Sequence, residues 1–102
     1  MAQLTRPRLS GQLRAMVSFA RFANEHNLHP GDLADLLALA RRAFNAGERY
    51  CNTGSERDGN AEQKTGKDFE RKAKLMGFGV QWPGLWPTLT KGKRHIYLPE
   101  VP

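Results

Sequence analysis

The side chains best suited to chemistry in this 102-residue sequence are cations, and four of them follow one helical spacing. Positions i, i+3, i+7 and i+10 fall on one side of an α-helix, so these cations form a line. They are Lys64, Lys67, Arg71 and Lys74. The line has two interpretations. It is either a solvated helix face, partly neutralised by Asp68 and Glu70, or a contact for successive phosphates of a nucleic acid, which would release counterions.

A second cationic cluster lies near the C-terminus, among aromatic side chains. Gly92-Lys93 suits a two-residue type II′ hairpin, with glycine at the first central position. The cations at the tip would be Lys91, Lys93 and Arg94. Trp86 and Tyr97 then belong to the outer face, which predicts a contact with nucleic acid or with protein. The alternative is that Trp82 and Trp86 cover the end of the helical core.

No catalytic or metal-binding motif is present in the sequence. The only soft or near-neutral candidates are Cys51, His26, His29 and His95, and none is paired at ligand spacing. The single cysteine excludes an internal disulfide. We therefore expect a binding protein that is not an enzyme, with no cofactor, no metal and no small-molecule substrate.

The charge balance of +6 favours an acidic partner: the phosphate backbone of DNA or RNA, or an acidic protein surface. The apolar and charged fractions, 39% and 25%, are those of a soluble globular protein. No apolar run approaches the length of a membrane span, and the N-terminus lacks the apolar block of a signal peptide. We expect a cytoplasmic protein that does not contact a membrane.

The elements that must position these cations form one α+β domain over residues 1–102. A long apolar stripe over residues 32–51 predicts a central, strongly buried helix with Asp32 as its N-cap. The polar residues 52–60 predict an exposed loop, and a switch from helical spacing to Thr, Val, Ile and aromatics after residue 77 predicts a hairpin. The expected parts are a flexible basic arm (1–9), a helical core (10–76, with helices over 12–25, 32–51 and 61–76) and a Trp- and Pro-rich hairpin (78–102).

The order of three helices followed by a basic hairpin resembles a winged-helix domain. In that fold the third helix enters the major groove and the hairpin tip touches the DNA backbone. Two features depart from it: the loop of about nine residues before the third helix, and the length of the second helix.

The ending MGFGVQWPGLWPTLTKGKRHIYLP is similar to the C-terminal ends of small bacteriophage and prophage accessory proteins. The resemblance implies a bacterial host cytoplasm and a binding role. We therefore expect a small basic nucleic-acid-binding accessory protein encoded by a phage or prophage. The alternative is a phage-encoded factor that binds and modulates a host protein, such as a nucleic-acid enzyme.

Overall fold

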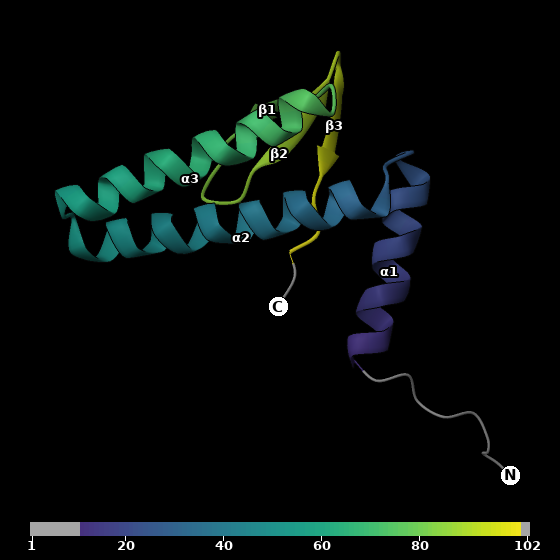
Figure 1. Ribbon diagram of the computed structural model, residues 1–102, viewed down its shortest axis with the longest axis horizontal. Helices are drawn as coiled ribbons and strands as arrows, with labels where there is room; N and C mark the ends of the chain where they lie inside the picture. Colours follow the sequence, from purple (N-terminus) through teal and green to yellow (C-terminus); the bar gives the residue numbers. More distant parts are fainter. Residues whose placement is uncertain (1–10, 101–102) are drawn as a thin grey trace, which may run out of the picture. The chain divides into compact units, whose positions relative to one another are not determined.

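Three helices followed by a three-stranded antiparallel sheet make up this protein in the computed structural model (Figure 1). The structure describes the backbone of residues 11–100 and the side chains of residues 18–100. The predicted α+β class and the predicted order, helices first and strands last, are confirmed. The arm expected over residues 1–9 lies outside the described residues. The elements are α1 (Gly11–Glu25), α2 (Pro30–Thr53), α3 (Glu56–Leu75), β1 (Gly79–Gln81), β2 (Thr88–Lys91) and β3 (Arg94–Tyr97).

Within residues 11–100 the chain divides into two compact units after Leu33, and α2 crosses the boundary near its N-terminus. In the first unit, α1 ends in a left-handed turn at Asn27, which has a φ of 55°. Leu28 then donates its backbone N–H to the Ala23 carbonyl at 2.8 Å. Asparagine tolerates this conformation better than other non-glycine residues do, so it can end the helix in place of glycine. All the candidate site residues belong to the second unit.

The second helix begins at Pro30, two residues before the expected start, so the assignment of Asp32 as N-cap is wrong. Proline is favoured at the first helical position, because its φ is already helical and it lacks the N–H that would be left unbonded. His29 caps this end. Its carbonyl accepts from Leu33 N–H, and its ring Nδ1 accepts from Gly31 N–H, both at 3.0 Å.

The polar segment predicted as a loop over residues 52–60 is mostly helical, so the third helix begins at Glu56 and not near residue 61. Ser55 is its N-cap, with an extended backbone (φ −77°, ψ 152°) and a hydroxyl that accepts from Asp58 N–H at 3.2 Å. The connection is short because Gly54 takes a left-handed φ of 62°. The polar composition reflects capping and exposure of a helix rather than a loop.

The second and third helices run side by side and antiparallel, as a helical hairpin (Figure 1). An ion pair joins Asp35 Oδ2 of α2 to Lys72 Nζ of α3 at 3.5 Å. The two helices of a helix-turn-helix instead cross at about 90–120°. We therefore do not assign the chain to the winged-helix class.

At the C-terminal end of α3 a glycine turns the chain toward the sheet. Gly77 has a φ of 91°, and Phe78 N–H donates to the Ala73 carbonyl at 2.9 Å. This is the pattern of a Schellman cap, and it confirms the left-handed cap expected at Gly77. Phe78, which follows, is buried at 8% exposure.

The sheet has the order β1-β2-β3. The predicted hairpin register is confirmed: Thr88 pairs with Tyr97, Leu89 with Ile96, Thr90 with His95 and Lys91 with Arg94. Gly92 has the positive φ (62°) that the first central position of the turn requires. The additional strand β1 was not predicted. Its Gly79 lies so close to β2 that a Cβ there would come within 2.6 Å of Thr90 Oγ1.

The core of the second unit lies between the helical hairpin and the inner face of the sheet. Leu89 and Ile96 point inward from β2 and β3, at 0% and 3% exposure. Phe69 of α3 is fully buried and contacts the Trp82 ring edge-on, with 5.7 Å between centroids. The helical residues buried with them include Leu36, Leu37, Ala40, Ala43 and Ala73.

Candidate functional site

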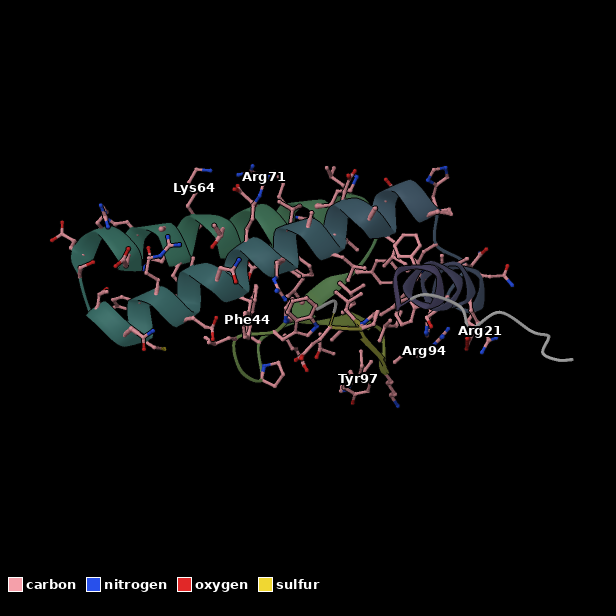
Figure 2. All side chains as sticks on the ribbon, turned by 90° about the horizontal axis from the view of Figure 1, so that it is seen from below. Arg21, Phe44, Lys64, Arg71, Arg94 and Tyr97 are labelled. Carbon is pink, nitrogen blue, oxygen red and sulfur yellow. The ribbon has the colours of Figure 1, made fainter. Side chains whose placement is uncertain are left out.

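The four cations predicted to form a line on the third helix are all exposed on α3. Lys64 and Arg71 have 78% and 73% of their side chains in solvent. Figure 2 shows both of them pointing away from the sheet. Because Lys67 and Lys74 share their side of the helix by spacing, the structure brings the predicted line together on the outer side of the helical hairpin.

One carboxylate lies within this line and partly neutralises it. Asp68 accepts from Lys64 Nζ at 3.1 Å and lies 3.6 Å from an Arg71 Nη. Among the residues that the structure describes, no ion pair involves Lys67 or Lys74. The expected neutralisation of Lys74 by Glu70 is absent, because Glu70 instead accepts from the Trp82 indole N–H at 2.7 Å.

Sequence reasoning missed three further cations on this side. Arg57 lies seven residues before Lys64 on α3 and is 89% exposed, within the segment that the sequence predicts as a loop. The capping pattern Ser55-x-x-Asp58 is the signal that could have placed it on the helix.

The other two cations come from α2. Arg49 is close enough to Asp58 of α3 to help lower its pKa, and Asp35 forms the ion pair with Lys72. Positions 35, 42 and 49 are spaced by seven residues, which is about two helical turns, so they share one edge of α2. Arg42 therefore lies on this edge, between Asp35 and Arg49. We call the exposed cations of this outer side the helical face: Arg42, Arg49, Arg57, Lys64, Lys67, Arg71 and Lys74.

A buried carboxylate holds the N-terminal end of the helical face in place. Asp58 is 4% exposed and accepts from the hydroxyls of Thr53 and Ser55. These hydrogen bonds, Thr53's first, lower the pKa of Asp58, and Arg57 and Arg49 lower it further against the opposing effect of burial. A carboxylate at this position also interacts favourably with the positive end of the helix dipole.

The second predicted cluster lies on the other side of the second unit. We call Lys91, Lys93 and Arg94 the hairpin tip, and all three are exposed. In Figure 2, Arg94 and Tyr97 lie on the side opposite to Lys64 and Arg71. Lys91 Nζ lies 5.4 Å from the centre of the Phe78 ring, a cation–π distance. The helical face and the hairpin tip are therefore two separate basic surfaces and not one continuous site.

The two aromatic residues predicted at the site have different surroundings. Trp86 is half-buried: its indole N–H donates to the Leu98 carbonyl at 2.9 Å, and its ring lies edge-on to Phe44 at 6.2 Å. Tyr97 is 70% exposed and contacts His95 edge-on at 6.3 Å. Trp86 therefore belongs to the packing of the unit, and Tyr97 is the aromatic ring that the sheet presents to solvent.

Among the side chains that the structure describes, no three His, Cys, Asp or Glu residues gather as metal ligands would. No helix within residues 11–100 is long and apolar enough to cross a membrane. Comparison of this chain with protein-family models, with curated proteins and with solved structures found no match.

Proposed function

We propose that this protein binds nucleic acid through the phosphate backbone, with the helical face as the contact. The observation that carries the proposal is the concentration of seven exposed cations on the outer side of the α2–α3 hairpin. Three carboxylates, Asp35, Asp58 and Asp68, lie close to cations of the two helices. The bacterial cytoplasm and a role as a phage or prophage accessory protein are part of the same proposal, and they rest on the resemblance of the C-terminal quarter.

The dimensions of the helical face support a duplex ligand. From Arg57 to Lys74 the helix rises by about 25 Å, at about 1.5 Å per residue. B-DNA has a major groove about 12 Å wide, so the row can contact phosphates of both strands. Lysine and arginine contacts to phosphate position a protein but carry no sequence information. We therefore expect weak sequence preference and a steep dependence of affinity on salt.

A second candidate function is supported by the opposite side of the unit. The hairpin tip lies at the turn between β2 and β3, and the exposed Tyr97 lies on β3, an edge strand of the sheet. Tyrosine and arginine are enriched in protein interfaces, and a compact group of cations complements an acidic patch. This side would contact an acidic host protein surface, for example on a nucleic-acid enzyme.

The test compares charge reversals on the two surfaces. In a fluorescence polarisation assay with random duplex and single-stranded DNA, Lys67→Glu with Arg71→Glu should abolish binding at low salt. The matched control, Lys93→Glu with Arg94→Glu, reverses the same number of charges and should leave most of the affinity. Each single loss of a phosphate contact should also reduce the salt-dependence slope by about 0.9 for duplex DNA.

Absence of any DNA or RNA binding at low salt would overturn the first candidate. The second candidate would then be tested by purifying the protein from its host. Co-purification of a host protein that is released by the tip reversal, but retained by the α3 reversal, would establish contact through the sheet side. If both double variants released the host protein equally, its binding would depend only on the net charge of this protein and on neither surface in particular.

A further inference from the structure

A cavity of about 360 Å³ opens in the second unit, between α2, α3 and the connection from β1 to β2. Its apolar walls are Ala43 and Gly47 of α2, and Trp82 and Leu85 of the connection. This volume falls within the range of small-ligand pockets, about 300–1,000 Å³, which are mostly apolar with a few polar groups that fix orientation.

Two helix-interior glycines, Gly47 and Gly66, line this cavity, and a side chain would meet different surroundings at each. At Gly47 a Cβ would come within 2.8 Å of Leu85 Cδ2, so the Leu85 side chain would have to shift to make room for it. At Gly66 a Cβ would meet only Trp82 Cζ2, at an ordinary contact distance of 3.7 Å. Glycine lowers helix stability relative to alanine, so a residue with a side chain at position 66 would make α3 more stable. Its absence leaves the cavity open.

The polar groups at the cavity favour a cation. Glu62 and Glu70 both line it, with Lys67 as the opposing charge. One oxygen of Glu70 accepts from the Trp82 indole N–H at 2.7 Å, which holds this carboxylate beside the indole ring. A carboxylate next to a tryptophan is a favourable environment for an organic cation, because the ring face attracts positive charge and tryptophan does so most strongly.

We propose that this cavity binds a small organic cation, an ammonium or guanidinium group carried on a flat apolar body. The apolar body packs against Leu85 and Trp82 in front of Gly66, and the charged group is directed to Glu62 and Glu70. The charged groups that line the cavity, two carboxylates and one ammonium, sum to a negative charge, although the protein as a whole carries +6. A cation is therefore attracted to this cavity. This site does not depend on nucleic-acid binding.

The test uses three probes of one shape and different charge: phenethylammonium, 2-phenylethanol and phenylacetate. Binding is followed by NMR through the indole N–H signal of Trp82, which Trp82→Phe identifies against that of Trp86. The cation should bind about tenfold more tightly than the neutral alcohol, since a charged partner of a carboxylate adds about 1.4 kcal/mol. The anion should not bind. Equal affinity for cation and alcohol, or no shift with the cation, would overturn the proposal.

Two variants connect binding to this cavity. Gly66→Leu places a side chain in the space and should abolish binding of phenethylammonium, with a melting temperature at or above that of the wild type. Glu62→Gln should weaken it severalfold, whereas the control Glu48→Gln, an exposed α2 carboxylate outside the cavity, should not. Unchanged binding in folded Gly66→Leu would show that the probe lies elsewhere, and the assignment would be rejected.

Discussion

The helical face and the hairpin tip are both basic, but their cations are held in different ways. On α3 the helical backbone fixes the positions of the charges, so they follow a line of about 25 Å. At the hairpin tip three cations share one four-residue turn, and one of them, Lys91, lies over the Phe78 ring. A line of charges matches an extended polyanion, whereas a compact group matches a local acidic patch.

These two surfaces depend on the same core. Phe69 and Ala73 project from the inner side of the helix that carries most of the helical face, and Leu89 and Ile96 project from the strands that carry the tip. A change in the core should therefore affect both surfaces together, and a change at the surface should affect only one.

Phe69→Ala should destabilise the protein by about 3–5 kcal/mol, because it empties a fully buried aromatic position. DNA binding by the helical face should be lost in proportion to the unfolded fraction, which urea denaturation measures. Leu75→Ala on the same helix is the control. Leu75 is 80% exposed, and its loss should change stability by less than about 0.5 kcal/mol. Similar effects of the two substitutions would show that α3 does not pack as described.

Trp86→Phe should cost about 1–2 kcal/mol, because it keeps an aromatic ring against Phe44 but leaves the Leu98 carbonyl without its indole donor. Nucleic-acid affinity of the folded variant should be unchanged. Tyr97→Phe is the matched control and should leave stability within about 0.5 kcal/mol, since this side chain is 70% exposed. A selective loss of DNA binding in Trp86→Phe would instead make this ring part of the contact.

Ser55→Ala should cost about 1 kcal/mol through loss of the α3 N-cap. The effect should be confined to one end of the helical face, so amide hydrogen exchange should speed up in the first turn of α3 and not in the sheet. Ser55→Thr retains a capping hydroxyl and should exchange nearly as slowly as the wild type. If amide exchange in Ser55→Ala became faster across all of α3 and the sheet, the effect of the lost cap would not be confined to the first turn of α3.

Asp68→Asn should increase affinity for duplex DNA at low salt by about two- to fivefold, because it removes the carboxylate that holds Lys64 and Arg71. The gain should shrink as salt is raised. Glu48→Gln, on α2, removes one negative charge away from the line and should have a smaller effect. Weaker binding in Asp68→Asn would mean that the carboxylate orients these cations productively.

Features that depend on neighbouring residues were correctly predicted. The register of β2 with β3 followed from Gly92-Lys93 and from side-chain alternation, because a two-residue turn leaves one pairing that buries both Leu89 and Ile96. Gly77 marked the end of α3 for a similar reason. The predicted starts of α2 and α3 were wrong because proline and serine both break helices and begin them, and Pro30 and Ser55 here do the latter.

The arrangement of these elements in space was decided by tertiary structure. The spacing of Lys64, Lys67, Arg71 and Lys74 already determined that they share one side of a helix, because that depends only on helical geometry. Which way that side faces depends on how α3 packs against α2 and the sheet. The packing of α2 against α3 adds Arg42 and Arg49 to the helical face. The same packing separates this face from the hairpin tip and leaves the cavity beside Gly66. These relations join residues far apart in the chain, and no local pattern encodes them.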